Sequence, residues 1–223
     1  MGILAFGINH KSASVDLRGR IAFAPEIVVE SLQSAQGVMG AAEIALLSTC
    51  NRTEIYVSGD ISDQQLLRWL AESKNLNIEE LQDCFYCHRD QQAIRHMISV
   101  ASGLDSLVLG EPQIFGQIKS AYSVGREAGT VATELNQAFQ KAFAAAKRVR
   151  SETAIGQNPV SVAYASVSLA EQIFADLNAA HALLIGAGET IELVARHLQE
   201  KNIRQITVAN RTLTRAQELA QDF

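Results

Sequence analysis

Apolar and polar positions from Ile3 to His88 follow the pattern of an α/β domain. Apolar runs of strand length occupy Ile3–Ile8, Ala42–Ser48, Thr53–Ser58 and Cys84–His88. Between them, helical spacing begins at Pro25, and an amphipathic helix is predicted over Asp63–Ser73. The order β-α-β-β-α-β is that of the ferredoxin-like split βαβ sandwich, a fold that assigns no function by itself.

After His88 the pattern predicts a run of helices, followed by strands that alternate with helices. Additional helices are predicted over Gln91–Ala101, Thr133–Ser151 and Val160–Leu177, and one more begins at Pro112, which takes the N1 position. The predicted helix Val160–Leu177 has Val160, Tyr164, Val167, Phe174 and Leu177 on one face. Strands at His181–Ile185 and Gln205–Ala209 then alternate with helices within Gly186–Glu200 and Leu213–Phe223. This order is the start of a Rossmann-type doubly wound domain, which needs about five or six strands. With a break at Gly156–Pro159, we predict domains at residues 1–157 and 158–223 and expect the chain to be a fragment.

Composition narrows the class of protein. The chain is 48% apolar and has no low-complexity tract, which excludes disordered and fibrous proteins. Three cysteines, an N-terminus without a basic leader and the absence of long apolar runs predict a cytoplasmic protein with no membrane segment. The net charge of −5 means that nucleic-acid contact needs a local basic patch. Lys141, Lys147, Arg148 and Arg150 offer one, although such runs are usually solvated helix faces.

A glycine-rich turn in the second half predicts a dinucleotide site. Gly186 permits a tight strand-to-helix turn, and Gly188 lets the backbone approach a pyrophosphate. Ile191 replaces the third glycine of the motif, so the helix is expected slightly farther from the sheet. Arg211 follows the next strand, where an arginine suits the 2′-phosphate of NADP. The predicted cofactor is NADPH, held by Gly186, Ala187, Gly188, Glu189, Thr190, Ile191, Asn210, Arg211 and Thr212.

Cys50 lies in a polar segment between two predicted strands. In an extended chain Ser48, Cys50 and Arg52 point to the same side, where the guanidinium favours a thiolate or binds an anionic substrate. A small buried side chain is an equal alternative. Taken alone, His96 is interpreted as a packed histidine, and the helix start at Gly110–Gln113 as ordinary capping or a carboxylate cradle.

The segment Cys84–His88 matches the CxxCH attachment pattern of c-type haem. We reject that interpretation because no export signal precedes it and because residues three apart in a strand face opposite sides. A second cysteine pair, which would complete a zinc site, is also missing from the sequence. No metal site is predicted.

Several blocks together resemble the glutamyl-tRNA reductase family. They are GINHK at residues 7–11, STCNRTE at 48–54, ASGLDSLVLGEPQ at 101–113, GAGE at 186–189 and ANRT at 209–212. The resemblance covers the whole chain and departs at Ser12, Ser14 and Gly19, where the family usually has Thr, Pro and an acidic residue. The family continues for about as many residues again, with the rest of the nucleotide domain and a dimerisation domain.

The resemblance implies NADPH-dependent reduction of glutamyl-tRNA to glutamate-1-semialdehyde, the first committed step of tetrapyrrole (porphyrin) biosynthesis. Cys50 would form a thioester and His96 would assist proton transfer. Arg52 would pair with the substrate side-chain carboxylate and Glu111 with its ammonium group. The implied glutamyl pocket comprises Thr49, Cys50, Asn51, Arg52, Ser106, Glu111, Pro112, Gln113 and Gln117. Handover to glutamate-1-semialdehyde aminotransferase and a homodimer are also implied.

Two other functions stay open. An NADP-dependent dehydrogenase acting on a free metabolite would be indifferent to tRNA. A haem-sensing or partner-binding module without enzymatic activity would use Cys84, Cys87 and His88. Labelling of Cys50 by glutamyl-tRNA would separate both from the reductase.

Overall fold

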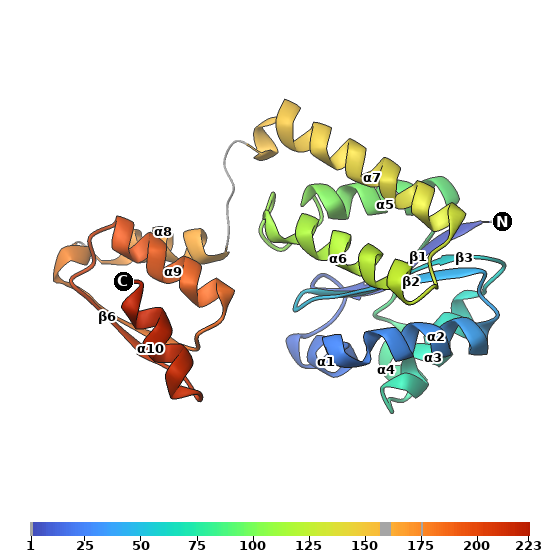
Figure 1. Cartoon of the computed structure of the whole chain (residues 1–223), viewed down its shortest axis with the longest axis horizontal. Coiled ribbons are helices and arrows are strands. Elements are labelled where there is room, and N and C mark those ends of the chain that lie inside the picture. Colours follow the sequence, from blue (N-terminus) through green and yellow to red (C-terminus); the bar gives the residue numbers. More distant parts are fainter. Residues whose placement is uncertain (1, 157–161, 175) are drawn as a thin grey trace. The chain divides into compact units, whose positions relative to one another are not determined.

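The computed structural model describes residues 2–156, 162–174 and 176–223 (Figure 1). Its contacts divide the chain into two compact units, Met1–Pro159 and Val160–Phe223, each with its own hydrophobic core. The predicted break at Gly156–Pro159 and the predicted helix start at Val160 involve residues 157–160, which lie outside the described residues.

A four-stranded antiparallel sheet in the order β2-β3-β1-β4 forms the middle layer of the first unit (Figure 1). Its strands are β1 (Ile3–Asn9), β2 (Glu43–Ser48), β3 (Arg52–Ser58) and β4 (Tyr86–Arg89). β3 separates the parallel strands β2 and β1, and β1 separates β3 and β4. This is the split βαβ arrangement, and the predicted α/β fold is confirmed.

Four helices cover one face of this sheet (Figure 1). They are α1 (Val15–Ile21), α2 (Val28–Met39, after a 3₁₀ turn at Pro25–Ile27), α3 (Asp63–Ser73) and α4 (Ile78–Gln82). Alternate β1 residues Leu4, Phe6 and Ile8 point into this layer because strand side chains alternate between faces. The sequence prediction missed α1 and α4, which have only 7 and 5 residues and too few apolar positions to show a helical period.

Three longer helices cover the opposite face: α5 (Asp90–Ser102), α6 (Gln113–Glu127) and α7 (Thr133–Glu152). Pro112 is the N-cap of α6 and not, as predicted, its first helical residue. Small strand residues such as Ala5 and Ala45 let Met97 and Phe139 pack closely on the sheet. Polar side chains on this face of β3 are therefore buried beneath helices.

The second unit contains a parallel pair of strands, β5 (His181–Ile185) and β6 (Gln205–Ala209), with α8 (Val162–Ile173), α9 (Glu189–Glu200) and α10 (Leu213–Gln221). α8 ends at Ile173, so the predicted helix to Leu177 is too long and Phe174 lies beyond it. On α8, Val167 is buried and Tyr164 is exposed. Leu177 lies in a separate 3₁₀ turn after α8 has ended. Across the described ranges of both units, no helix has the length and hydropathy needed to span a bilayer.

Candidate functional site

Cys50 lies at the tip of the turn that joins β2 to β3. The Thr49 amide donates to the Arg52 carbonyl at 2.8 Å, and Thr49 Oγ1 accepts from the Asn51 and Arg52 amides, both at 3.2 Å. The chain therefore reverses here, and the predicted extended segment with Ser48, Cys50 and Arg52 on one side is wrong. The alternative of a small buried side chain is also wrong, because Cys50 is exposed.

Arg52 enters the sheet directly after this turn and is only 1% exposed. Its Nη1 donates to Glu54 at 2.5 Å, and its Nη2 donates to the carboxylate of Asp105 at 3.0 Å and to the Asp105 carbonyl. Burial disfavours the charged guanidinium, but the adjacent Glu54 carboxylate raises the pKa of Arg52 above its ordinary value. Arg52 is therefore a cation held between the carboxylates of Glu54 and Asp105.

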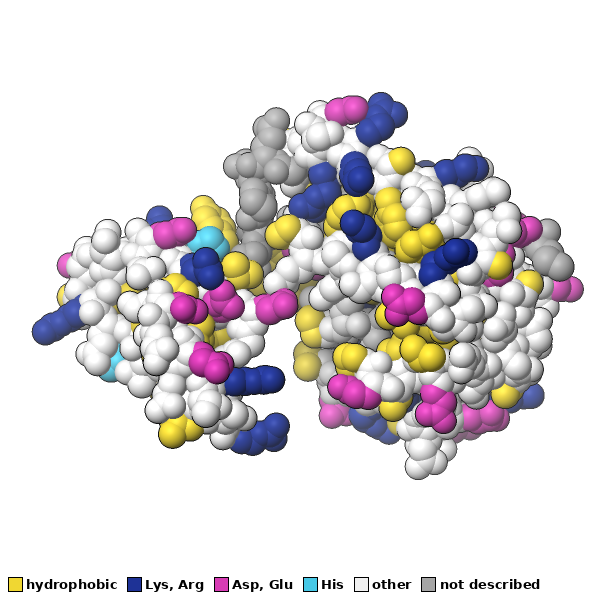
Figure 2. Space-filling view, in the orientation of Figure 1, with side chains coloured by type: hydrophobic (Ala, Val, Ile, Leu, Met, Phe, Trp, Pro, Cys, Tyr) yellow, Lys and Arg dark blue, Asp and Glu magenta, His cyan; other side chains and the backbone are white. Residues whose placement is uncertain are grey.

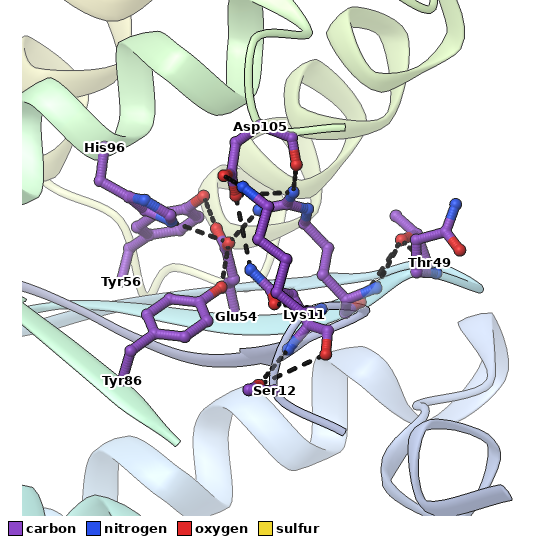
Figure 3. Close-up of polar contacts among 11 residues, drawn as sticks. Lys11, Ser12, Thr49, Glu54, Tyr56, Tyr86, His96 and Asp105 are labelled. Atoms are coloured by element: carbon purple, nitrogen blue, oxygen red, sulfur yellow. Dashed lines mark hydrogen bonds and ion pairs between the residues drawn. The ribbon is translucent and has the colours of Figure 1, made fainter. Parts of the chain in front are cut away.

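Glu54 is the centre of the buried polar cluster in Figure 3. Glu54 Oε1 accepts hydrogen bonds from the Arg52 guanidinium and from the Tyr86 hydroxyl at 2.6 Å, and it lies 2.9 Å from His96 Nε2. The other oxygen, Oε2, accepts a hydrogen bond from the Tyr56 hydroxyl. Burial alone would raise the pKa of Glu54, but His96 and Arg52 hold it well below its usual range. Glu54 is thus an ionised carboxylate inside the protein, stabilised only by its partners.

The loop 103–112 between α5 and α6 brings Asp105 to Arg52. Gly103 and Gly110 both have positive φ, and the Gly110 amide donates to the Gly103 carbonyl at 2.9 Å, which closes the base of the loop. From α7, Arg150 donates to the carbonyls of Ser102, Gly110 and Glu111. Only the tip of the loop, which carries Asp105, is thus free of these anchors.

Asp105 also accepts from Lys11 at 2.5 Å and from Asn9 at 3.4 Å. Burial opposes ionisation of Asp105, but Lys11 and Arg52 lower the pKa of its carboxyl group. Arg52, Lys11 and Asn9 therefore converge on a single carboxylate.

Two buried polar atoms near this cluster lack a hydrogen-bond partner in the described part of the chain: His10 Nδ1 and Ser106 Oγ. The His10 amide donates to the Asn51 carbonyl at 2.9 Å, which ties β1 to the Cys50 turn. Burial and the positive charge of Arg52 lower the pKa of His10, so its imidazole is neutral at neutral pH. Polar atoms of this kind are normally paired, so each of these two atoms has a free hydrogen-bonding position.

The predicted site residues form one group around the Cys50 turn and one around the start of α6. Thr49, Cys50, Asn51 and Arg52 make the turn; Ser106, Glu111, Pro112, Gln113 and Gln117 belong to the loop and the first turns of α6. Arg52 links the groups through Asp105, and His96 joins them through Glu54. Within the described residues, no hydrogen bond connects Cys50 directly to His96.

Sequence reasoning missed several residues of the cluster, among them Lys11, Glu54, Tyr56, Tyr86 and Asp105. Glu54 and Tyr56 could have been found, since they share one face of the predicted strand Thr53–Ser58. The structure extends this strand to Arg52, which lies on the same face. Lys11, Tyr86 and Asp105 come from other elements, and only the tertiary structure brings them to this place.

The basic residues of α7 have different partners. Arg150 holds the 103–112 loop, and Arg148 pairs with Glu152 at 3.1 Å. Lys141 and Lys147 are exposed, and Figure 2 shows Lys and Arg side chains on the α6–α7 side of the first unit. These exposed lysines match the expected solvated helix face, and a nucleic-acid contact there stays an untested alternative.

The CxxCH segment is arranged differently from the prediction. β4 begins at Tyr86, so Cys84 precedes the strand, and both thiols pack against the same core. The argument that they face opposite sides is therefore wrong. Burial and a hydrogen bond to Asp63 raise the pKa of Cys87 to about 12. No group of three or more His, Cys, Asp or Glu residues in the described segments is placed to hold a metal ion.

In the second unit, two loops adjoin at the carboxyl ends of β5 and β6. Gly186 has a φ of 116°, and its amide donates to the Ala209 carbonyl at 2.7 Å. Gly188 caps α9, and a Cβ atom there would meet nothing within 4 Å, so the helix N-terminus is open to a ligand. Ile191 packs against the core, and Arg211 is exposed. This edge of the sheet is where doubly wound folds bind nucleotides, and the open helix N-terminus suits the phosphates of a dinucleotide.

Comparisons with known proteins agree with both units. "Glutamyl-tRNAGlu reductase, N-terminal domain" matches residues 6–153, and "Shikimate / quinate 5-dehydrogenase" matches residues 168–223. Glutamyl-tRNA reductases of Ectopseudomonas mendocina and Pseudomonas fluorescens are 58% and 60% identical over the whole chain and 53% of their own length.

Glutamyl-tRNA reductase from Methanopyrus kandleri is a similar solved structure, with a TM-score of 0.65 and 35% identity over 99% of this chain and 52% of that chain. The chain spans about half the length of these relatives. The resemblance seen in the sequence blocks is confirmed. The match to the N-terminal domain of this family covers well over half of the chain, and the chain therefore belongs to the glutamyl-tRNA reductase family.

Proposed function

We propose that this chain carries the acyl-transfer site and the beginning of the NADPH site of an enzyme that reduces glutamyl-tRNA to glutamate-1-semialdehyde for porphyrin biosynthesis. The observation that carries the proposal is the exposed Cys50 on a rigid turn whose next strand residue is the buried cation Arg52. A nucleophile and a cationic anchor for an acidic substrate are thus held two positions apart.

Cys50 supplies the chemistry that a glutamyl ester requires. Its sulfur attacks the ester carbonyl, a C–S bond forms, the C–O bond to the tRNA ribose breaks, and the tRNA hydroxyl leaves with a proton. Bound NADPH would supply the hydride that reduces the thioester. Collapse of the resulting thiohemiacetal then releases the aldehyde and restores the Cys50 thiol.

The cluster around Arg52 accounts for selection of glutamate. A substrate side-chain carboxylate would take the donors of Arg52 and Lys11 that Asp105 occupies in this structure. Glu111 would face the substrate ammonium group, and the unpaired Ser106 Oγ would gain a partner. A site built from buried polar pairs discriminates strongly against analogues that lack one partner.

The cofactor and assembly parts of the proposal rest on the second unit and on the family. Gly186, Gly188 and the N-terminus of α9 would hold the pyrophosphate, and Arg211 the 2′-phosphate. We further propose that the complete protein is a cytoplasmic homodimer that passes its unstable aldehyde to glutamate-1-semialdehyde aminotransferase.

Radiolabelled glutamyl-tRNA tests the proposal directly. We expect covalent label on Cys50 that Cys50→Ser abolishes, because a serine hydroxyl stays protonated whereas a thiol supplies a few per cent thiolate near neutrality. Cys84→Ser and Cys87→Ser are the matched controls and should retain labelling, since both thiols are half-buried in the core. Unchanged labelling in the Cys50 variant would overturn the assignment.

A further inference from the structure

The proposed reaction uses Cys50 and Arg52, and we further propose that His96 assists proton transfer, as the family resemblance implies. The carboxylate that lies between Arg52 and His96 is still without a function. Glu54 is completely buried, and its Oε1 contacts both the Arg52 guanidinium at 2.5 Å and His96 Nε2 at 2.9 Å. One side chain therefore connects the cation proposed to bind the substrate with the histidine proposed to move a proton.

The surroundings of Glu54 determine which nitrogen of His96 carries a proton. Glu54 is ionised beside Arg52, and its Oε1 already accepts from Arg52 and Tyr86. An ionised carboxylate only accepts hydrogen bonds, so the His96 Nε2 at 2.9 Å must be the protonated nitrogen. In the neutral ring Nδ1 is then the lone-pair nitrogen, and within the described residues it has no hydrogen-bond partner.

The orientation of the His96 ring is also fixed. Tyr86 and His88 lie against it with ring centroids 5.2 and 4.7 Å away, and its side chain is only 10% exposed. Both aromatic neighbours belong to β4, whereas Glu54 belongs to β3. His96 is therefore held by two strands and cannot turn Nδ1 inward without losing its bond to Glu54.

We propose that Glu54 is a positioning residue of the acyl-transfer site: it keeps His96 as the Nε2–H tautomer, with Nδ1 available to the reacting groups, and it fixes Arg52 in the same contact. This arrangement follows the general logic of a base oriented by a third group. The inference deepens the proposed function and rests on it.

Glu43 provides a matched control. It is a second buried carboxylate, 5% exposed, and it accepts from the backbone amides of Ala132, Glu134 and Leu135 at the start of α7. Glu43→Gln removes a buried negative charge from the same unit without touching His96. Glu54→Gln removes the charge that constrains the tautomer, because an amide can donate as well as accept.

The experiment combines imidazole nitrogen NMR with single-turnover labelling of Cys50 by glutamyl-tRNA, using the full-length protein. We expect the Nε2–H form of His96 in the unmodified protein and in Glu43→Gln, and a mixture of tautomers in Glu54→Gln. Labelling should slow at least tenfold in Glu54→Gln and change less than twofold in Glu43→Gln, at a temperature where both variants are folded.

Each result decides the question. An Nδ1–H form of His96 in the unmodified protein would overturn the inference even if Glu54→Gln did not fold. So would an unchanged tautomer in a folded Glu54→Gln, or equal slowing in both variants, which would indicate a structural role only. Failure of the unmodified protein to label Cys50 would instead contradict the proposed function, while the NMR result would still report on Glu54.

Discussion

At the scale of single residues, the site depends on charges that water does not reach. Arg52 is 1% exposed and Glu54 is fully buried, so each is stable as an ion only because charged and polar partners surround it. Removing one partner of such a pair typically costs about 3–5 kcal/mol, because the remaining charge is uncompensated. Asp105 differs, since its side chain is 20% exposed and sits on the tip of a loop.

Asp105 is expected to compete with the substrate. Its carboxylate takes donors from Arg52 and Lys11 that the glutamyl carboxylate would also need. Asp105→Asn should therefore lower the KM for glutamyl-tRNA by roughly fivefold, which corresponds to about 1 kcal/mol, the worth of a typical hydrogen bond. Steady-state kinetics with glutamyl-tRNA measures the effect. The same tRNA charged with glutamine is the control, and its binding should not improve; a raised KM for the glutamyl form would contradict competition.

Arg211 is expected to distinguish NADPH from NADH. It is exposed beside the Gly186 turn, at the end of β6, where a 2′-phosphate would lie. In the full-length protein Arg211→Ala should weaken NADPH binding by about 1.5–3 kcal/mol, the value of a hydrogen bond to a charged group, and leave NADH almost unchanged. Titration with both cofactors measures this. Equal weakening of the two would show that Arg211 does not contact the phosphate.

At the scale of elements, the pairing of β1 with β3 makes room for the buried cluster. Gly7 lies opposite Glu54 in this register. A Cβ atom on Gly7 would come within 2.7 Å of Glu54 Cγ and 2.9 Å of the Tyr86 hydroxyl. Because Gly7 on β1 has no side chain, the Glu54 carboxylate on β3 has room for several hydrogen-bond partners.

Gly7→Ala should accordingly destabilise the first unit by about 1–3 kcal/mol, the usual cost of overpacking, and slow Cys50 labelling because Glu54 must move. Gly37→Ala is the matched control: Gly37 lies within α2 with nothing near its Cβ position, so alanine should stabilise by about 0.5–1 kcal/mol. Urea denaturation of both variants tests the pair. If Gly7→Ala left the free energy of unfolding unchanged, the cluster would have more room than the structure shows.

Among the individual elements, the sequence predicted helix bounds best where the hydrophobic periodicity and the N-terminal capping residues indicate the same start. The predicted bounds of α3, Asp63–Ser73, match because Ser62 and Gln65 form a capping box before an amphipathic run. Cys50 was placed correctly between two strands, but the reversal of the chain at this point was missed, since the turn geometry depends on the Thr49 hydrogen bonds. The contacts of Arg52 with Asp105 and of Glu54 with Tyr86 join distant segments, and local pattern contains no signal for them.

At the scale of the whole chain, the two units differ in how completely their sheets are covered. Helices pack on both faces of the first sheet, and the residues proposed for acyl transfer all lie within that unit. In the second unit Leu184 is buried, but Leu183 and Ile185 on the other face of β5 are 60% and 76% exposed. Parallel sheets are normally covered on both faces, so we expect the second unit to be the less stable part of this chain.

This difference predicts that the 223-residue chain, expressed by itself, forms the Cys50 thioester but does not reduce it. Acyl transfer needs only the first unit, whereas hydride transfer needs the nicotinamide held within about 0.5 Å of its productive position. A two-stranded sheet with one open apolar face does not provide that rigidity. Incubation with glutamyl-tRNA and NADPH should therefore label Cys50 and release glutamate slowly by hydrolysis, with no loss of NADPH absorbance. The full-length protein is the positive control, and stoichiometric NADPH oxidation by the shorter chain would contradict the argument.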